Sequence, residues 1–241
     1  MNIVTLPVYK DGEFLARAVD LLERFASTLG YECRLLIVED GSDSSQIVAE
    51  LQSRFSNILY LQHDQRLGRG KALREAWKRV EGDVYIYLDV DMATDLTKFD
   101  SFKKLVELQS EFDLVTGSRY VHGAVTSRPM IRKLTSLIYN CLVRFMFHTG
   151  VHDHQCGFKS FSKSLVEVLS REAKSDSWFW DTEVLVIAKE LGFRLVEIPV
   201  HWTEQKGKKT PLKRLIKDVW IHGAGLLSLA KRVYGRHLHR L

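Results

Sequence analysis

Two aspartates separated by one residue are the strongest candidates for chemistry in this sequence. Asp89 and Asp91 directly follow residues 84–88, an apolar run typical of a buried strand. Where a chain leaves a sheet, the side chains at positions i and i+2 can both turn toward the crevice at the strand end. Carboxylate oxygens, with a diphosphate completing the shell, suit Mg²⁺ or Mn²⁺. The pattern therefore predicts a metal site at Asp89 and Asp91, against the alternative of two ordinary surface aspartates.

A second strand-like run, residues 35–38, ends in the polar cluster 39–42. Two interpretations of Asp40 stay open at this point. Its carboxylate could accept hydrogen bonds from a ribose or a base edge, or it could close an Asx-type turn or cap the helix that follows Asp43. In both cases a second carboxylate stands at a strand end.

Residues 67–73, Leu-Gly-Arg-Gly-Lys-Ala-Leu, look like a glycine-rich loop that opens a helix. Backbone N–H groups at a helix start, together with Lys71, could bind a phosphate. The dinucleotide-binding pattern needs a glycine where Leu73 stands, and the P-loop pattern needs an earlier glycine and a hydroxyl after the lysine. The loop therefore argues against a dinucleotide oxidoreductase and against a P-loop nucleotide triphosphatase.

Strand-like and helix-like segments alternate through the first half of the chain. Segments with helical periodicity separate the apolar runs at 3–8, 35–38, 58–61 and 84–88. Such alternation predicts an α/β fold with a mostly parallel sheet covered on both faces. In these sheets ligands bind at the carboxyl ends of the strands, where both carboxylate clusters fall.

The bulk composition is that of one ordinary globular domain. The chain has 241 residues, of which 45% are hydrophobic and 27% charged. Cys33, Cys141 and Cys156 form no close pair, which argues against a disulfide framework or a thiolate zinc site and favours a reducing cytosolic compartment. The N-terminus has no signal-peptide pattern, and the longest charge-free apolar stretch, between Lys133 and Arg144, is shorter than the ~20 residues of a membrane span. We expect a soluble or peripheral protein.

Positive charge is concentrated at the C-terminal end. Residues 208–241 hold nine Lys or Arg residues and one acid, Asp218, while the whole chain has a net charge of +5. An apolar stripe at helical spacing runs through the same segment, broken, if anywhere, at Gly223 or Gly225. We therefore predict a basic amphipathic helix over residues 211–241 that contacts an anionic membrane surface, with a helix packed on the sheet as the alternative. No nucleic acid partner is expected, because the rest of the chain is mildly acidic.

Taken together, these motifs resemble glycosyltransferase family 2 with the GT-A fold. The first half carries Pro7-Val8-Tyr9 with Asp11, then the segments 38–42, 67–72, 89–91 and 117–119, in the order and spacing of that family. In the second half, residues 155–159 and 198–204 are similar to the polyprenyl-phosphate (dolichyl-phosphate) hexosyltransferases, and closest to the dolichyl-phosphate glucosyltransferase branch. The resemblance extends from about residue 3 to residue 209. It implies a Rossmann-like, mostly parallel sheet flanked by helices.

The resemblance also assigns roles by position. It implies a nucleoside pocket formed by Pro7, Tyr9, Asp11 and Asp40, with Lys71 nearby. It implies that Asp89 and Asp91 bind the metal, and that Arg119, Arg132 and Ser136 hold an acceptor phosphate. Gln155 and Lys159 would border the sugar and the acceptor. Residues 207–210 depart from the family pattern, which leaves the phosphate contact of Lys209 open, whereas Ala93 agrees with the glucosyl branch.

The implied function is an inverting transfer of a hexose from a nucleotide diphosphate sugar, with UDP-glucose or another UDP-hexose favoured, to a polyprenyl (dolichyl) phosphate. The second pKa of a phosphate monoester is ~6, so this acceptor is a charged nucleophile at neutral pH and needs no general base. The departing diphosphate needs stabilisation, which Mg²⁺ or Mn²⁺ and cationic side chains can provide. The alternatives are a GDP-mannose-dependent mannosyltransferase, a non-catalytic nucleotide-sugar-binding module, and a nucleotidyltransferase.

The resemblance further implies a domain plan. A GT-A domain would cover residues 1–210, with a nucleotide-sugar-binding half (1–118) and an acceptor half (119–210), and the basic helix would follow over 211–241. We expect a peripheral protein on the cytoplasmic face of a membrane.

Overall fold

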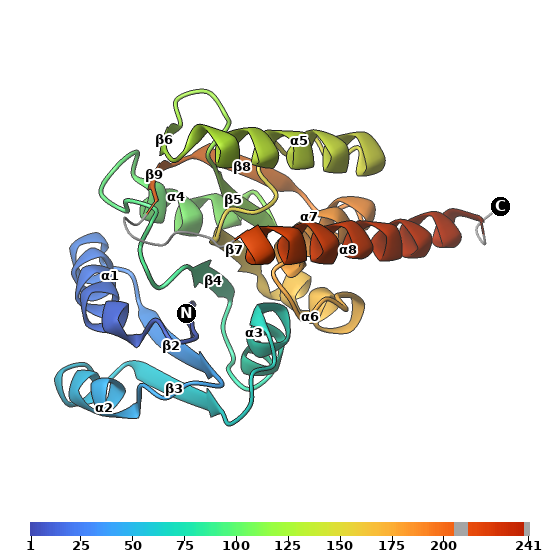
Figure 1. Cartoon of the computed structure of the whole chain (residues 1–241). Coiled ribbons are helices and arrows are strands. Elements are labelled where there is room, and N and C mark those ends of the chain that lie inside the picture. Colours follow the sequence, from blue (N-terminus) through green and yellow to red (C-terminus); the bar gives the residue numbers. More distant parts are fainter. Residues whose placement is uncertain (205–211, 239–241) are drawn as a thin grey trace.

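The computed structural model is an α/β domain built on a seven-stranded sheet (Figure 1). It describes the backbone of residues 1–204 and 212–238 and the side chains of residues 1–204 and 218–235. The strand order is β3-β2-β1-β4-β7-β5-β8. These strands are β1 (Asn2–Val8), β2 (Cys33–Asp40), β3 (Ile58–His63), β4 (Val84–Leu88), β5 (Leu114–Ser118), β7 (Phe158–Ser162) and β8 (Leu195–Pro199). A separate parallel pair joins β6 (Val125–Ser127) to β9 (His201–Thr203).

The first four strands follow the predicted alternation. β1 pairs with β2 and β4, and β2 pairs with β3, all in parallel. β7 is the exception, because it runs antiparallel to both β4 and β5, whereas β8 pairs with β5 in parallel. The mostly parallel α/β class predicted from the sequence is therefore confirmed, with one reversed strand that the apolar pattern did not reveal.

Helices cover both faces of this sheet. On one face lie α1 (Leu15–Leu29), α2 (Ser45–Arg54) and α4 (Ser101–Glu107); on the other lie α3 (Arg69–Trp77), α6 (Lys163–Glu172), α7 (Trp180–Glu190), α5 (Met130–Phe147) and α8 (Leu212–Leu238). Side chains of β4 alternate between the two cores, with Tyr85 and Tyr87 toward α3 and Ile86 and Leu88 toward α1. Since both faces are covered, the whole strand is apolar.

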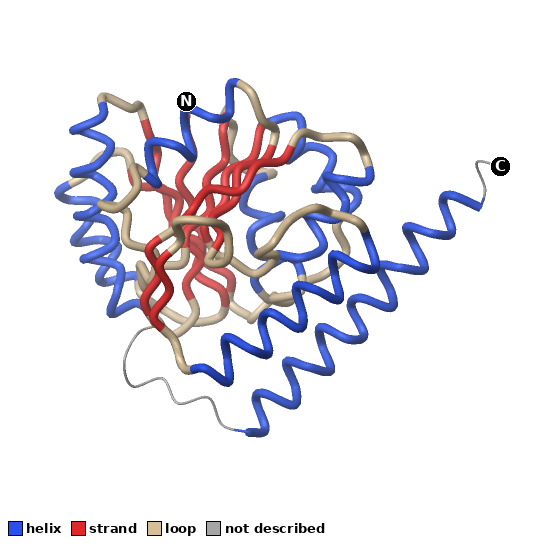
Figure 2. The backbone as a smooth tube through the Cα atoms, turned by 90° about the horizontal axis from the view of Figure 1, so that it is seen from above, coloured by secondary structure: helices blue, strands red, loops and turns tan. Residues whose placement is uncertain are grey.

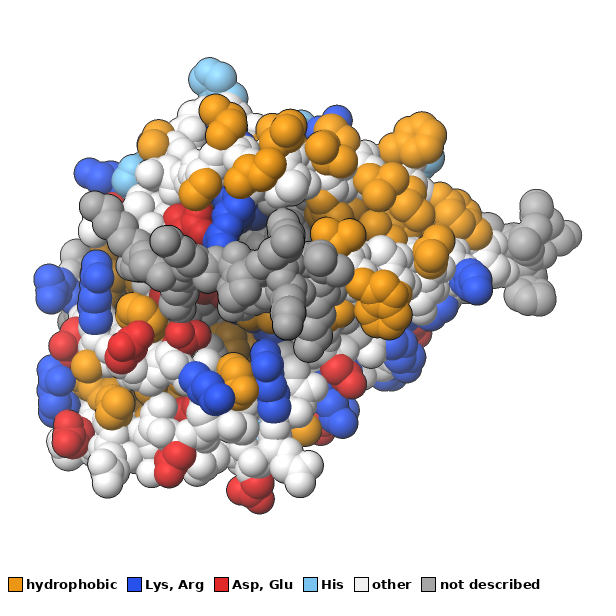
Figure 3. Space-filling model, in the orientation of Figure 1, with side chains coloured by type: hydrophobic (Ala, Val, Ile, Leu, Met, Phe, Trp, Pro, Cys, Tyr) orange, Lys and Arg blue, Asp and Glu red, His pale blue; other side chains and the backbone are white. Residues whose placement is uncertain are grey.

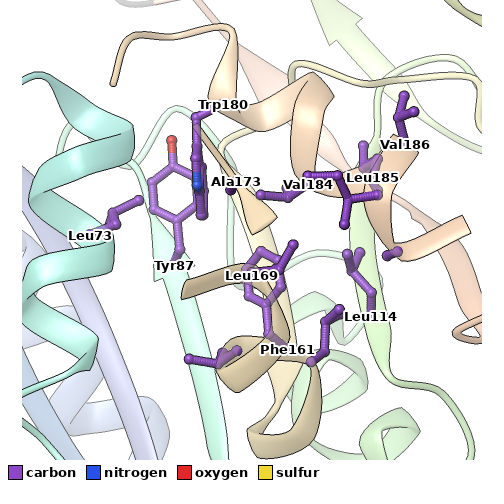
Figure 4. Close-up of a cluster of buried hydrophobic side chains, with 14 of the residues drawn as sticks. Leu73, Tyr87, Leu114, Phe161, Leu169, Ala173, Trp180, Val184, Leu185 and Val186 are labelled. Atoms are coloured by element: carbon purple, nitrogen blue, oxygen red, sulfur yellow. The ribbon is translucent and has the colours of Figure 1, made fainter. Parts of the chain in front are cut away.

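The larger hydrophobic core lies between the sheet and α3, α6 and α7 (Figure 4). Trp180, at the start of α7, is fully buried and contacts Tyr87 and Trp77 edge-on, with ring centroids 6.2 and 5.8 Å apart. Phe161 of β7 packs 5.9 Å from the same indole. This aromatic cluster fixes the end of β4 against the start of α7.

Two long helices, α5 and α8, lie side by side at one edge of the molecule (Figures 1 and 2). Phe147 of α5 stacks on Tyr234 of α8 with ring centroids 6.3 Å apart, and the Tyr234 hydroxyl donates to the carbonyl of Met146. α5 therefore supports α8 through these contacts.

α8 is continuous through both glycines at which the sequence suggested a break. Gly225 instead allows close packing, since a Cβ there would lie 2.5 Å from the ring of Phe179. Leu226, Leu229 and Val233 are buried in the core. One side of α8 therefore packs on the domain, as the alternative interpretation proposed. None of the helices, over the residues described, is long and apolar enough to cross a bilayer.

Candidate active site

Asp89 lies at the carboxyl end of β4 and contacts two polar side chains. Arg69, the first residue of α3, places Nη2 2.8 Å from Asp89 Oδ1, and the Tyr87 hydroxyl donates to the same oxygen at 3.2 Å. Asp91 follows two residues later, and its Oδ1 accepts a hydrogen bond from the Ala93 N–H at 3.1 Å. Both carboxylates thus lie at the strand end where ligands bind in such sheets.

A buried ion-pair network supports Asp89. Arg69 Nη1 lies 3.6 Å from Asp181 Oδ2, and Lys159 Nζ lies 2.8 Å from Asp181 Oδ1. The Trp178 ring covers the Arg69 guanidinium, 3.4 Å from the ring centroid. Burial alone would lower the pKa of Arg69, but the Asp89 carboxylate and neighbouring groups hold that pKa above its ordinary value. Arg69 therefore stays charged and orients the Asp89 carboxylate.

Gly157 leaves room for the same carboxylate. Its carbonyl accepts from the Asp89 N–H at 3.0 Å, and a Cβ at this position would lie 2.0 Å from Asp89 Oδ2. Within the described residues, no group of three or more His, Cys, Asp or Glu side chains could hold a metal. A cation at Asp89 and Asp91 would therefore take its other ligands from substrate phosphates and water, as Mg²⁺ commonly does. The donor set fits such a metal.

Asp40 makes two contacts that neither interpretation from the sequence included. It is 4% exposed, and its two carboxylate oxygens accept hydrogen bonds from the backbone N–H groups of Leu67 and Gly68, at 2.6 and 3.0 Å. Asp40 therefore fixes the glycine-rich loop to the end of β2. Hydrogen bonds that a carboxylate accepts from two backbone N–H groups are strong, which makes this loop a rigid part of the site.

The glycines of that loop serve packing. A Cβ at Gly70 would lie 2.4 Å from the carbonyl oxygen of Ser175, and the Gly70 N–H donates to Asp176 O at 3.0 Å. Since the N–H groups of Leu67 and Gly68 are also engaged, three donors of the predicted phosphate loop are already paired within the protein. Of the groups predicted to bind a phosphate, this leaves the side chain of Lys71, in the first turn of α3.

Three buried polar atoms of β2 and β3 lack a hydrogen-bond partner among the described residues. They are Glu39 Oε2, the Tyr60 hydroxyl and His63 Nε2. Glu39 is fully buried, and its other oxygen accepts from the Ser42 hydroxyl. An unpaired buried carboxylate oxygen is costly, so a ligand donor at Glu39 would relieve a real penalty.

The other residues predicted for the nucleoside surround the end of β1. Pro7 lies in β1, and Asp11 precedes the 3-10 helix Gly12–Phe14. The Tyr9 ring is covered by the Arg66 guanidinium, 3.9 Å from the centroid. This contact brings the loop after β3 to the end of β1, beside the unpaired atoms of Glu39 and its neighbours.

Arg119, predicted to hold the acceptor phosphate, is buried in a bidentate ion pair. Its Nε and Nη2 lie 2.7 and 2.8 Å from the two carboxylate oxygens of Asp153, and its side chain is 7% exposed. Burial would raise the pKa of Asp153, but the Arg119 charge lowers it overall. Most of the binding capacity of this guanidinium is therefore used within the protein.

Arg128 is the neighbouring cation that sequence reasoning missed. Its Nη1 lies 3.3 Å from Ser136 Oγ and 3.4 Å from the Tyr120 hydroxyl, and its Nε is buried without a partner. No carboxylate of the described residues pairs with it. Burial, and then repulsion from Arg119, lowers the pKa of Arg128, as expected for a cation that lacks an anion.

The remaining predicted acceptor residues have different surroundings. Ser136 Oγ lies 3.4 Å from Gln155 Oε1, and Arg132 pairs with Glu204. Lys159 is fully buried and pairs with Asp181, so it supports the site from within. Lys209 lies outside the described residues.

Residues 155–157 join the two halves of the site. Gly157 contacts Asp89, whereas Gln155 contacts Ser136 of α5 and, at 3.3 Å, His222 of α8. The carboxylates after β4 and the cationic side chains of the acceptor half therefore adjoin one short segment.

The neighbouring segment 152–154 has a structural role. Asp153 pairs with Arg119, and the buried His154 ring contacts Asn140 and Thr149, each at 2.9 Å. Desolvation lowers the pKa of His154 to about 3. These contacts tie the segment to Arg119 and to α5.

Residues 3–170 match the family described as Glycosyl transferase family 2. This chain belongs to glycosyltransferase family 2. It is 37% identical over 230 residues to glycosyltransferase AglD of Haloferax volcanii. The aligned region covers 93% of this chain and 36% of AglD. It is 28% identical over 224 residues to a dolichyl-phosphate beta-glucosyltransferase of Trichomonas vaginalis (89% of this chain, 69% of the relative) and 27% identical over 250 residues to that of Saccharomyces cerevisiae (90% and 72%). The predicted family and branch are confirmed, and the chain spans about a third of the length of AglD.

Solved structures agree with the predicted GT-A fold. Glucosyl-3-phosphoglycerate synthase from Mycobacterium tuberculosis, in complex with UDP, has a TM-score of 0.70 at 16% identity, covering 95% of this chain and 80% of that one. Mannosyl-3-phosphoglycerate synthase from Rubrobacter xylanophilus has a TM-score of 0.71 at 14% identity, covering 98% and 75%. A further structure of the mycobacterial enzyme, with Mn²⁺, UDP and phosphoglyceric acid, has a TM-score of 0.68 at 16% identity and covers 95% and 78%. At this identity the likeness establishes the fold.

Proposed function

We propose that this glycosyltransferase moves a hexose from a nucleotide diphosphate sugar, UDP-glucose in the first instance, to a polyprenyl phosphate with inversion. The dolichyl-phosphate beta-glucosyltransferases among its relatives support this substrate pair. The observation that carries the proposal is the segment 155–157. It contacts Asp89, one of the two carboxylates suited to a donor diphosphate, and Ser136, which in turn contacts Arg128 on the side suited to an acceptor phosphate.

On the donor side, Asp89 and Asp91 would hold Mg²⁺ or Mn²⁺. When bound, such an ion would stabilise the negative charge that develops on the departing diphosphate. The Mn²⁺ and UDP in the mycobacterial neighbour support this choice of cofactor. Arg69 orients Asp89 through its 2.8 Å contact. Lys71, in the first turn of α3, is our candidate for a phosphate contact.

The nucleoside would bind at the ends of β1 and β2, between Tyr9 and the buried Glu39. We assign to Glu39 Oε2 the acceptance of a hydrogen bond from a base N–H, since this oxygen lacks a partner among the described residues. Asp40 acts on the same pocket indirectly, because it fixes the loop at Leu67. Pro7 and Asp11 would complete the wall.

On the acceptor side, we assign the phosphate to Arg128, Arg132 and Ser136. Guanidinium groups bind phosphate oxygens in pairs, and Arg128 has no carboxylate partner among the described residues. Arg119 would position this cluster through its pair with Asp153. The acceptor phosphate is already ionised at neutral pH, with a second pKa of ~6, so direct attack on the anomeric carbon needs no proton acceptor and inverts its configuration.

The predicted domain plan, the membrane contact of the C-terminal helix and the location on the cytoplasmic face belong to the same proposal. Residues 1–118 would bind the donor and residues 119–210 the acceptor, whose lipid chain requires access to a membrane. Lys209 keeps its predicted role as a phosphate contact in this scheme.

The test is transfer of radiolabelled sugar from UDP-glucose, UDP-GlcNAc or GDP-mannose into an organic-extractable polyprenyl phosphate, with and without Mg²⁺ or Mn²⁺. We expect metal-dependent label in the lipid phase with UDP-glucose. Label from GDP-mannose alone would replace the proposed donor. Nucleotide binding without label from any donor would point to a binding module.

A further inference from the structure

Large apolar side chains are exposed along the whole length of α5. Seven of its large hydrophobic side chains are exposed: Met130 (77%), Ile131 (66%), Leu134 (53%), Leu137 (37%), Ile138 (61%), Leu142 (46%) and Phe145 (81%). The inward side of the helix buries Ser136, Asn140, Val143 and Phe147. A helix on the surface of a soluble domain normally carries polar residues on its outer side. α5 therefore carries large apolar side chains on a side that the described domain leaves uncovered.

α8 extends this surface. Val219, Trp220, Leu227 and Tyr234 are 68%, 73%, 65% and 46% exposed, on the helix that packs beside α5. Figure 3 shows the hydrophobic side chains gathered over these two helices on one face of the molecule. We call these eleven exposed side chains of α5 and α8 the α5–α8 face. Apolar patches that are contiguous over two helices mark interaction surfaces.

The charges around this face indicate the partner. α5 contains three basic residues, Arg132, Lys133 and Arg144, and no Asp or Glu. Lys133 and Arg144 are exposed on α5, as is Lys231 on α8. Helices that lie in an anionic membrane interface have this composition: one side carries Leu, Ile, Phe and Trp, and Lys and Arg lie beside it. A contact between the α5 helices of two copies would bring the same cations together, because α5 has no Asp or Glu to pair with them.

The position of the α5–α8 face relative to the site also favours a membrane surface as the partner. Ser136 on the inward side of α5 contacts Arg128 and Gln155, and Arg132 lies in the first turn of the same helix. A helix that rests in the interface would place these groups at the depth of lipid headgroups. A membrane-bound phosphate could then reach them without leaving the bilayer.

We propose that the α5–α8 face binds the surface of an anionic lipid bilayer, with α5 as the principal embedded helix. This assigns the membrane contact to the middle of the chain, in addition to the basic C-terminal helix predicted from the sequence. The proposal rests on the proposed function only where it places the acceptor phosphate at the interface.

The experiment is flotation of the full chain with vesicles of phosphatidylcholine and phosphatidylglycerol, at low and high salt. The variant carries Ile138→Glu and Phe145→Glu, and the matched control is Phe99→Glu. Phe99 is 38% exposed and precedes α4, on the opposite side of the sheet. We expect the double variant to bind vesicles at least about tenfold more weakly, because each substitution removes an apolar side chain from the layer and adds a charge. The control should bind like wild type.

Equal vesicle binding by wild type and double variant, with both proteins folded by thermal melting, would overturn the proposal. The proposal would also be overturned if the wild-type chain did not bind vesicles but formed dimers that the double variant cannot form. Transfer to a short, water-soluble prenyl phosphate separates this inference from the proposed function. The double variant could keep transfer to the short acceptor and lose only transfer to the long-chain acceptor in vesicles. In that case both the membrane face and the proposed reaction hold. If no variant transfers sugar but vesicle binding still depends on Phe145, the membrane face stands and the proposed reaction falls.

Discussion

Gly157→Ala tests how the strand-end carboxylate is positioned. The added Cβ would lie 2.0 Å from Asp89 Oδ2, whereas ordinary contacts begin at 3.4 Å. The Asp89 carboxylate must therefore move by about 1.4 Å, and its 2.8 Å contact with Arg69 must change with it. Misplacing a reacting group by ~1 Å can cost ~10²-fold in rate, which corresponds to ~2.7 kcal/mol of transition-state stabilisation.

The assay measures kcat/KM for sugar transfer over a range of Mn²⁺ concentrations, with nucleotide binding followed by calorimetry. We expect kcat/KM to fall ~10²-fold and the half-saturating metal concentration to rise. Gly223→Ala is the matched control, since Gly223 lies in α8 and a Cβ there meets no atom within 4 Å. A folded Gly157→Ala enzyme with wild-type activity and metal response would refute the argument that Asp89 must stay in this position.

Three further predictions concern other parts of the account. Asp181→Asn removes the shared partner of two buried cations, so the free energy of unfolding in urea should fall by ~3–5 kcal/mol; Asp176→Asn, at a half-exposed surface pair, should cost less than ~1 kcal/mol, and equal losses would contradict the buried network. Arg128→Gln should raise the KM for the lipid phosphate by about tenfold or more and leave the KM for the donor nearly unchanged, since a charge-assisted phosphate contact contributes ~1.5–3 kcal/mol; Arg54→Gln is the surface control, and an unchanged acceptor KM would remove Arg128 from the site. His154 has a pKa lowered to about 3 by burial, so the unfolded chain binds a proton that the folded chain does not between about pH 6.5 and 3; stability should fall on acidification through this window by up to ~1.4 kcal/mol per pH unit, and a His154→Asn protein with the same slope would assign that slope to other groups.

Much of the fold could be predicted because β1, β2 and β4 are mostly buried on both faces and have continuous apolar runs. The runs of β2 and β4 end abruptly in acidic residues, so residues 35–40 and 84–91 indicated both the strands and their functional ends. The reversed strand β7 carries no such mark. Its adjacent polar residues Lys159 and Ser160 are buried because they find partners in Asp181 and Gln109.

The site was harder to predict because its polar groups find partners far away in the sequence. Asp40 binds backbone groups 27 residues later, and Arg119 pairs with a carboxylate 34 residues later. No local pattern distinguishes a carboxylate that binds substrate from one that fixes a loop. A usable signal existed for Asp181, which stands in an apolar stretch of α7 where a buried charge must have a partner.

The apolar residues of α8 divide between a buried side and an exposed side of the helix. The sequence offered a membrane contact or packing on the sheet as alternatives. In the structure, Leu226 and Leu229 pack into the core while Trp220 and Leu227 remain exposed. The hydrophobic periodicity could not separate these sides, because it reports only that apolar residues recur.

The most direct test of the central claim is transfer of label from UDP-glucose to polyprenyl phosphate by the wild-type chain and by Asp91→Asn, with Mn²⁺ and with a chelator. We expect label in the lipid phase for the wild type with Mn²⁺, and loss of that label on chelation or in Asp91→Asn. Wild-type transfer that survives both the chelator and the substitution would contradict the account, as would a wild-type chain that transfers no label to the lipid.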